Sequence, residues 1–223
     1  MQTEEAVAGG RRERKKRETR LALAAAALRL AAEKGPDNVT VEEISEAADV
    51  SVRTFFNYFP HKEHAILGRD PEDLERSLTR LREAPAEQSP LTMLRVLVSQ
   101  ALADFEDKAG DAKERVELIG RSPALLAQFV LLGAEDERAL SSALAERMGE
   151  PPVSLRPALL VGAVTTAVRV AAEKQKLAGE HEVPDLTALV DEAFALLADG
   201  LDPAYDKSVL LQAPLTRVQE GQS

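Results

Sequence analysis

The stretch of sequence that decides the fold is residues 40–63, TVEEISEAADVSVRTFFNYFPHKE. It opens with a capping box, in which the Thr40 hydroxyl and the Glu43 carboxylate each satisfy a free backbone N–H at a helix start. Asp49 and Ser51 then interrupt the pattern, because Asp tolerates the left-handed backbone of a sharp turn and Ser is a good N-cap. The next helix stops before a proline. The stretch therefore predicts two short helices joined by a tight turn.

A helix-turn-helix unit has this outline, and its second helix can enter the major groove of DNA. Val50, Phe55 and Phe59 are expected to hold the two helices at a fixed angle. The outward-facing side chains can hydrogen-bond phosphates or base edges, and they are Ser51, Arg53, Thr54, Asn57 and Tyr58. A helical hairpin with a purely structural role has the same geometry, so the pattern alone leaves both interpretations open.

The rest of the sequence predicts an all-α protein. Ala and Leu recur while aromatic residues make up only 4% of the chain, a mixture that favours helix. A helix is expected from Glu18 to Lys34, ended by Gly35 and Pro36. Further helices are expected over residues 61–67, 71–82, 90–108, 111–120, 123–148, 154–177 and 184–199.

The formal net charge of −10 is unevenly distributed. Residues 1–69 contain 12 Lys and Arg against 11 Asp and Glu, whereas residues 70–223 contain 16 against 27. Basic side chains concentrate in one segment, at Arg11, Arg12, Arg14, Lys15, Lys16, Arg17 and Arg20. We therefore expect residues 1–16 to form a flexible basic arm that can face phosphate, with a merely solvated run of charge as the alternative.

Several classes of protein are disfavoured by what the sequence lacks. With no cysteine, disulfides and thiolate metal sites are excluded. No signal peptide or membrane span is apparent, so a cytoplasmic location is expected. An enzyme is the main rival class, but the histidines (His61, His64 and His181) form no catalytic or metal-ligating pattern. No metal and no cofactor are expected.

Residues 40–63 closely resemble the DNA-binding signature of TetR-family regulators, and the resemblance extends back through the helix over residues 21–35. It implies three DNA-binding helices, a fourth that links to a larger helical domain, and a homodimer on double-stranded operator DNA. Transferred position by position, it assigns DNA contacts to Thr40, Ser51, Val52, Arg53, Thr54, Tyr58 and Lys62. We add Asn57 and His61 from the same stretch and Arg17 from the basic segment between Arg11 and Arg20.

Two positions depart from the family pattern. Asp49 stands where Gly is commoner, which changes little. Phe56 stands where many members have a phosphate-binding Tyr, so we expect Phe56 to be a packing residue. Arg53 fits two roles equally, a bidentate contact to guanine or a grip on phosphate.

The C-terminal pattern resembles a branch of the family associated with acyl-CoA-like ligands, the mycofactocin-regulator-like branch. The resemblance rests on residues 115–119 before Ser122, on residues 143–147 and on residues 185–197. The candidate ligand-binding residues are Met93, Leu97, Phe105, Leu126, Phe129, Val130, Thr165 and Arg169. An apolar set at helical spacing is also typical of plain core. Arg169 suits an anionic ligand or, alternatively, an ion pair at the dimer interface.

The sequence thus predicts a basic arm (1–16), a helix-turn-helix domain (17–64), a helical regulatory and dimerisation domain (65–200) and a tail (201–223). Small residues between Val161 and Ala172 allow close helix approach, and with the following helix they could build a four-helix bundle across a two-fold axis. We expect a repressor that binds a palindromic operator and is released by a small apolar or acyl-type effector. An effector-independent dimer and an activator remain as alternatives.

Overall fold

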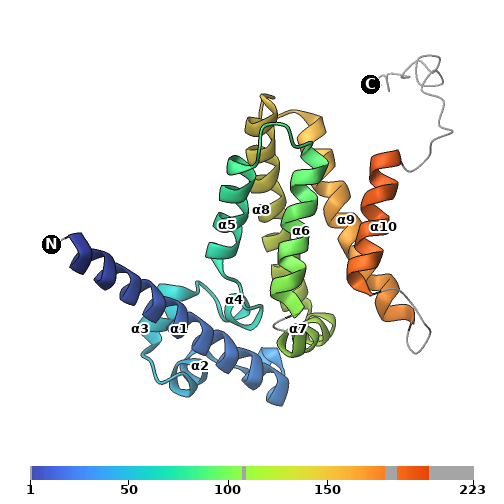
Figure 1. Cartoon of the computed structure of the whole chain (residues 1–223). Coiled ribbons are helices and arrows are strands. Elements are labelled where there is room, and N and C mark those ends of the chain that lie inside the picture. The colour runs from blue at the N-terminus through green and yellow to red at the C-terminus, as the bar shows by residue number, and fades with distance from the viewer. Residues whose placement is uncertain (1, 107–108, 179–184, 201–223) are drawn as a thin grey trace, which may run out of the picture. The chain divides into compact units, whose positions relative to one another are not determined.

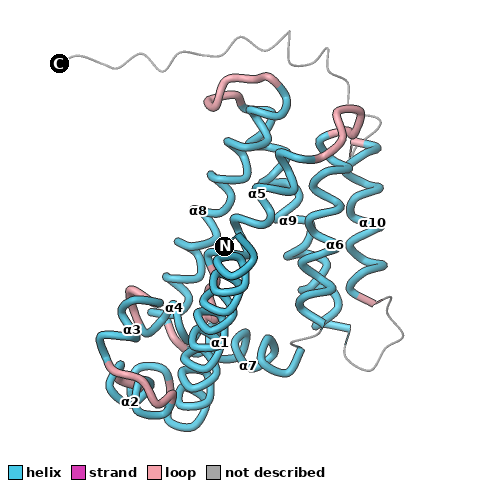
Figure 2. The backbone as a smooth tube through the Cα atoms, turned by 60° about the vertical axis from the view of Figure 1, so that its left-hand side comes forward, coloured by secondary structure: helices cyan, strands magenta, loops and turns pink. Residues whose placement is uncertain are grey.

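The computed structural model describes residues 2–106, 109–178 and 185–200, which contain helices joined by loops and turns and no strand, as Figures 1 and 2 show. The elements are α1 (Gln2–Lys34), η1 (Pro36–Asn38), α2 (Val41–Ala47), α3 (Val52–Tyr58), α4 (Lys62–Ile66), α5 (Pro71–Glu83), α6 (Pro90–Glu106), α7 (Ala109–Arg121), α8 (Pro123–Met148), α9 (Leu155–Ala178) and α10 (Leu186–Asp199). The all-α prediction is confirmed. The predicted tail over residues 201–223 lies outside the described residues.

Local chemistry sets the ends of α2 and α3. Thr40 and Glu43 form the predicted capping box at the start of α2. Asp49 has a φ of 53°, the left-handed backbone expected of the turn. Ser51 caps α3 by accepting a hydrogen bond from the backbone N–H of Thr54. The helix-turn-helix outline predicted from the sequence is therefore present.

These helices close over a small apolar core with α1. Leu23 and Ala27 from α1, Ile44 from α2, Phe55 from α3 and Phe59 after it are all essentially inaccessible to solvent. Each large apolar side chain buried here contributes about 1.5–3 kcal/mol to the stability of the fold, before the entropy of ordering the chain is subtracted. This core fixes the angle at which α3 is presented.

The start of α1 differs from the prediction. A flexible arm was expected over residues 1–16, but α1 runs without interruption from Gln2. Arg, Lys and Glu are good helix formers, so the segment gains helical propensity from the same charges that suggested an arm. Arg14 and Glu18 also form an i,i+4 ion pair on its surface. The absence of an apolar period therefore did not exclude a helix.

The next elements share the core of the first three. Ala65 and Ile66 of α4, Leu118 of α7 and Leu125 of α8 belong to the same buried cluster as α1 to α3. The α7–α8 junction is fixed by Ser122, which caps α8 through the N–H of Leu125. The predicted boundary at residue 64 is therefore not a boundary between separate cores.

Residues 1–165 form one compact unit and the residues from 166 onward form a second, with the division inside α9. Within the first unit, α5, α6 and α8 run side by side (Figures 1 and 2). In the described part of the second unit, Ala171, Val190 and Phe194 are buried while Val170 and Leu196 are exposed.

By length and composition alone, one described helix is apolar enough to cross a membrane, Leu155–Gln175. Lys113–Arg121 with Pro123–Met148 would pass only as a single span bent by 116°. Core helices of soluble proteins pass the same test.

Candidate nucleic-acid interface

Helix α3 presents a distinct outward face. Arg53, Phe56 and Asn57 are exposed at i, i+3 and i+4, so they lie next to one another on the helix surface. Phe55 and Phe59, on the opposite face, are buried. The exposed face combines a guanidinium, an aromatic ring and an amide, which are groups able to contact base edges and thymine methyls.

Phe56 does not pack into the core as expected. Its side chain is 55% exposed, and its ring meets the edge of Phe55 at 5.4 Å between centroids. The core position is already filled by Phe55, so the next residue along the helix has to point elsewhere. The expectation that Phe56 is a packing residue is wrong, and Phe56 joins the outward face.

The hydroxyls predicted to contact phosphate also act as helix caps. Thr40 Oγ1 accepts from the N–H of Glu43 at 3.3 Å, and Ser51 Oγ accepts from the N–H of Thr54 at 3.1 Å. Ser51 Oγ and Thr54 Oγ1 are also within 2.8 Å of each other. Thr40 and Ser51 remain exposed to solvent, whereas Thr54 and Val52 are half-buried.

The capping carboxylate of Glu43 is strongly stabilised in its charged form. Lys34 donates a hydrogen bond to Glu43, and the backbone N–H of Thr40 donates a second, at 3.0 Å. The hydrogen bond from Lys34, followed by the one from Thr40, lowers the pKa of Glu43 to about 2. This pair joins the end of α1 to the start of α2.

Lys62 has a role that the sequence did not predict. Its ammonium donates three hydrogen bonds to backbone carbonyls, those of Pro36 at 3.0 Å, Asp37 at 3.2 Å and Val39 at 2.8 Å. An ammonium has three donors, so all of them are engaged here. In this chain Lys62 therefore fixes the turn that precedes Thr40, and a phosphate could be contacted only by giving up one of these bonds.

Arg20 is a positioning residue that sequence analysis counted only among the basic charges of α1. Its guanidinium lies 4.9 Å from the ring centroid of Phe59 and 5.7 Å from that of Tyr58. It also donates to the carbonyl of Arg69 at 3.1 Å and pairs with Asp70 at 3.7 Å. The sequence offered one signal of this packing role, because position 20 lies on the apolar stripe of α1, four residues before buried Ala24.

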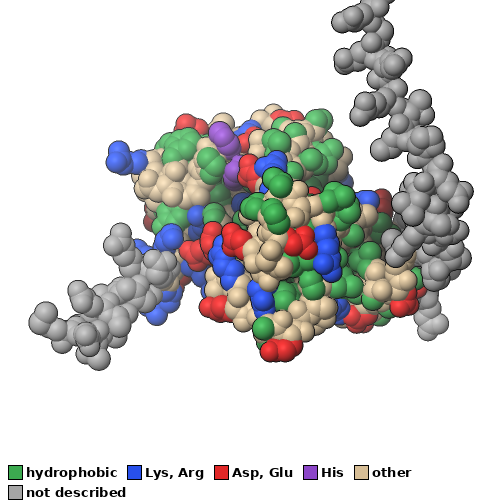
Figure 3. All heavy atoms as spheres, turned by 90° about the horizontal axis from the view of Figure 1, so that it is seen from above, with side chains coloured by type: hydrophobic (Ala, Val, Ile, Leu, Met, Phe, Trp, Pro, Cys, Tyr) green, Lys and Arg blue, Asp and Glu red, His purple; other side chains and the backbone are tan. Residues whose placement is uncertain are grey.

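The remaining predicted DNA contacts lie at the surface. Arg17 and His61 are exposed, and Tyr58 is half-buried beneath Arg20. Lys and Arg side chains gather where the described side chains of α1 begin (Figure 3). His64 contacts His61 edge to face, and burial lowers the pKa of His64.

Two contacts connect α4 and its following loop to the rest of the first unit. Arg69 forms a bidentate ion pair with Asp136 of α8, which raises the pKa of Arg69. Arg115 of α7 donates to the carbonyl of Ile66 at 3.1 Å. Gly68 has a φ of 67°, and a Cβ built on it would lie 2.9 Å from the guanidinium of Arg115. A side chain at position 68 is therefore disfavoured both by the left-handed backbone and by the close approach of Arg115.

The candidate ligand residues are not gathered in one place. Met93 and Leu97 line a pocket between α5 and α6, together with Leu81. The larger apolar candidates on α8 are instead exposed by 48–59%: Leu126, Phe129 and Val130. Helix α8 carries apolar residues around its circumference, so the sequence could not show which of them are buried. The side chain of Phe105 lies outside the described residues.

Thr165 and Arg169 are both exposed on α9. Thr165 Oγ1 bonds to the carbonyl of Val161 at 3.0 Å, and Arg169 pairs with Glu173 at 3.3 Å. Arg169 thus has an ion-pair partner on its own helix. Among the described residues, no cluster of His, Asp and Glu side chains could hold a metal ion.

This geometry defines a helix-turn-helix protein that carries a larger helical region behind its DNA-binding helices. Residues 23–65 match the family "Bacterial regulatory proteins, tetR family", and residues 88–202 match the "MftR C-terminal domain". The chain belongs to the TetR family of bacterial transcriptional regulators. It is a DNA-binding regulator and not an enzyme.

Individual relatives agree with this assignment. The HTH-type transcriptional regulator TcmR of Streptomyces glaucescens is 30% identical over 201 residues, covering 87% of each chain. The HTH-type transcriptional repressor KstR of Rhodococcus jostii (strain RHA1) is 32% identical over 84 residues, 38% of this chain and 39% of its own. The crystal structure of a TetR transcriptional regulator from Rhodococcus sp. RHA1 shares the fold, with a TM-score of 0.52, 18% identity and coverage of 84% of this chain and 100% of that one.

Proposed function

We propose that the protein is a ligand-responsive repressor that binds a palindromic operator as a homodimer. The observation that carries the proposal is the outward face of α3, where Arg53, Phe56 and Asn57 are exposed over a closed core. A core of this kind fixes the angle of α3, so the same three side chains always meet the groove. Repression is supported by the name of KstR, a repressor. A protein that binds chromosomal DNA is expected in the cytoplasm.

The dimer is expected to form through α9 and α10. Gly162, Ala163 and Ala167 are small, so a second helix can approach α9 closely. Val170 and Leu196 leave apolar surface exposed on the two helices. Two copies of α9 and α10 would form a four-helix bundle across a two-fold axis. A dimer that reads a palindromic operator is expected to hold its two recognition helices about 34 Å apart, one turn of DNA.

The response to an effector is expected to pass through the contacts around α4. Arg69 joins the loop after α4 to Asp136 of α8, and Arg115 of α7 holds the carbonyl of Ile66 at the end of α4. A small apolar or acyl-type molecule that favours another arrangement of α7 and α8 would therefore move α4 and change the spacing of the recognition helices. The match of residues 88–202 to the MftR C-terminal domain supports a role for this part of the chain that is separate from DNA binding.

The test measures the fluorescence anisotropy of labelled DNA from upstream of the gene. Arg53→Ala is expected to weaken binding at least tenfold, because one good base or phosphate contact is lost in each subunit. Arg82→Ala removes the same charge from an exposed position on α5 and serves as the matched control. Equal affinities for wild type and Arg53→Ala would contradict the proposed DNA-binding face.

A further inference from the structure

A pocket lies between α5 and α6, distinct from the outward face of α3. It has a volume of about 240 Å³ and is closed on its inner side by Leu81, Met93 and Leu97. Leu81 and Met93 are almost fully buried, so this part of the lining is permanently apolar. At about 30 Å³ each, the pocket has room for about eight water molecules, which suits a small molecule rather than a peptide.

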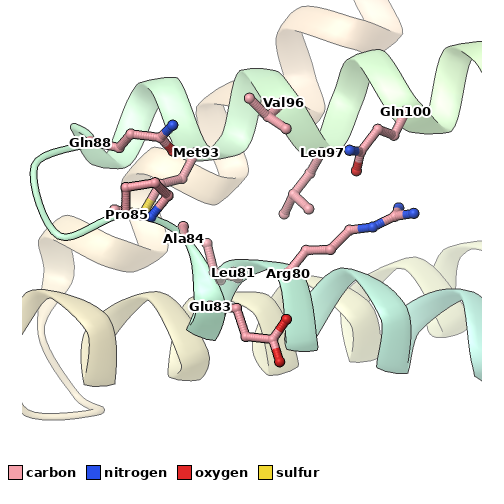
Figure 4. A pocket seen from close by; sticks show the side chains of 10 residues that line it. All are labelled: Arg80, Leu81, Glu83, Ala84, Pro85, Gln88, Met93, Val96, Leu97 and Gln100. Atoms are coloured by element: carbon pink, nitrogen blue, oxygen red, sulfur yellow. The ribbon is translucent and has the colours of Figure 1, made fainter.

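The guanidinium of Arg80 and the amide of Gln100 lie at one end of this pocket, and the amide of Gln88 lies at the other. Figure 4 shows the Arg80 guanidinium and the Gln100 amide beyond Leu97, whereas Met93 and Pro85 lie toward the other end. The carboxylate of Glu83 also belongs to the lining but points away on the far side of α5. The pocket is therefore apolar in its middle, with a positive charge and an amide at one end and a second amide, that of Gln88, at the other.

Gln100 is the unusual member of this lining. Its Oε1 atom is buried without a hydrogen-bond partner, which is rare because an amide oxygen loses its hydration on burial. One other described side-chain atom shares this condition, Nε of Arg147. Arg147 is next to the same pocket, since its guanidinium donates to the carbonyl of Ala84 at 2.9 Å. Of these two buried side-chain atoms, Gln100 Oε1 belongs to the lining, and Arg147 Nε lies beside it through the contact with Ala84.

Arg80 supplies a positive charge at the same end. Among the described residues it forms no ion pair, although Arg76 on the preceding turn is paired with Asp73. A guanidinium binds a carboxylate through two parallel hydrogen bonds. Gln100 Oε1, by contrast, accepts a hydrogen bond and so requires a donor such as a hydroxyl group.

We propose that this pocket binds a small hydroxy acid with an aliphatic body. The chain of the ligand lies against Leu81, Met93 and Leu97, its carboxylate accepts from Arg80, and its hydroxyl donates to Gln100 Oε1. The inference rests on the proposed function for its biological meaning, because it names the class of effector to which the regulator responds. Binding of the hydroxy acid in the pocket can itself be tested without DNA.

The experiment is titration calorimetry of the full chain with three probes of equal length. The probes are 3-hydroxyoctanoate, octanoate, which lacks the hydroxyl, and 2-octanol, which lacks the acid. The first is expected to bind at least tenfold more tightly than either of the others, because each of them leaves one polar group of the pocket unpartnered. Equal affinities for all three would overturn the proposal.

Variants locate the binding at the pocket. Gln100→Leu is expected to abolish the advantage of 3-hydroxyoctanoate over octanoate and, in the free protein, to raise the unfolding temperature, since a buried oxygen without a partner is removed. Arg80→Ala is expected to abolish the advantage over 2-octanol, whereas Arg82→Ala, on another face of α5, changes neither. An unchanged probe preference in Gln100→Leu, or a lower unfolding temperature, would show that the oxygen has another role.

A third variant and a DNA measurement separate the two proposals. Leu97→Trp fills the middle of the pocket and is expected to abolish binding of all three probes. If 3-hydroxyoctanoate binds as described but leaves the affinity for DNA unchanged, the proposed pocket is supported and the proposed ligand-responsive function is contradicted. If 3-hydroxyoctanoate releases DNA equally from wild type and Leu97→Trp, the protein responds to this ligand but binds it at a site other than this pocket.

Discussion

Replacing Lys62 by Met separates two roles for a side chain that the sequence assigned to DNA. The substitution keeps the apolar stem and removes the ammonium that donates to the carbonyls of Pro36, Asp37 and Val39. A hydrogen bond to a charged group contributes about 1.5–3 kcal/mol. Three bonds from one half-buried ammonium do not add, because water can replace some of them. We therefore expect the free energy of unfolding to fall by about 2–3 kcal/mol in total.

The assay is urea unfolding at one fixed protein concentration, since the stability of a dimer depends on concentration. The same protein is titrated onto labelled DNA at several salt concentrations. Lys113→Met, which removes an exposed charge from α7, is the control for both measurements. If Lys62 acts only on the turn before α2, the salt dependence of DNA binding keeps its slope.

A phosphate contact would give the opposite result. Each phosphate neutralised contributes about 0.9 to the slope of log K against log salt. The reasoning is refuted if Lys62→Met retains the stability of the wild type and lowers that slope by about 0.9 per subunit. Lys113→Met should change neither quantity.

Substitutions at three further positions, Asp49, Gly68 and Glu43, test the turns and caps. Asp49→Val should lower the free energy of unfolding by about 1–2 kcal/mol, because its φ of 53° disfavours a branched side chain, while Asp49→Gly stays within about 0.5 kcal/mol of wild type by urea unfolding. Gly68→Ala should destabilise by about 1–2 kcal/mol in the same assay because its Cβ meets Arg115 at a positive φ, whereas Gly133→Ala, a helical position with open space, should not. The pKa of Glu43 is lowered to about 2, so its stabilising effect is present above pH 4.5 and is lost as the pH falls toward 2. Glu43→Gln should therefore flatten the urea midpoint over this pH range, and an unchanged acid dependence would argue against the Lys34 pairing.

Local chemistry made the helix-turn-helix predictable from sequence. The capping box at Thr40, the left-handed turn at Asp49 and the N-cap at Ser51 depend on residues within three or four positions of one another, so their spacing shows in the sequence. The bounds of α8 were also predicted, because Ser122 and Gly149 mark its ends.

Contacts between distant parts of the chain were not predictable in the same way. Lys62 bonds to carbonyls 23–26 residues earlier, and nothing near it in the sequence marks those partners. Arg20 meets Arg69 and Asp70 about 50 residues later. Phe56 was assigned to packing because it lacks the hydroxyl of the phosphate-binding Tyr that many family members have there, but Phe55 already occupies the interior position. Tertiary placement decided each of these cases.

The same limit applied to the regulatory half. Apolar residues surround α8, so the sequence could not distinguish buried Leu125 and Leu144 from exposed Phe129 and Val130. Met93 and Leu97 share one face of α6 because they are four residues apart, and the pocket forms because α5 supplies Leu81 opposite them. That partner is known only once the helices are packed.

The most direct test of the central claim is selection of binding sites from random-sequence DNA by the full chain. A dimer that reads DNA through two α3 helices is expected to enrich an inverted repeat whose half-sites are centred about 10 base pairs, or one helical turn, apart. Arg53→Ala should relax the sequence preference of each half-site without changing their spacing. Enrichment of a single half-site, or of no sequence at all, would contradict the account.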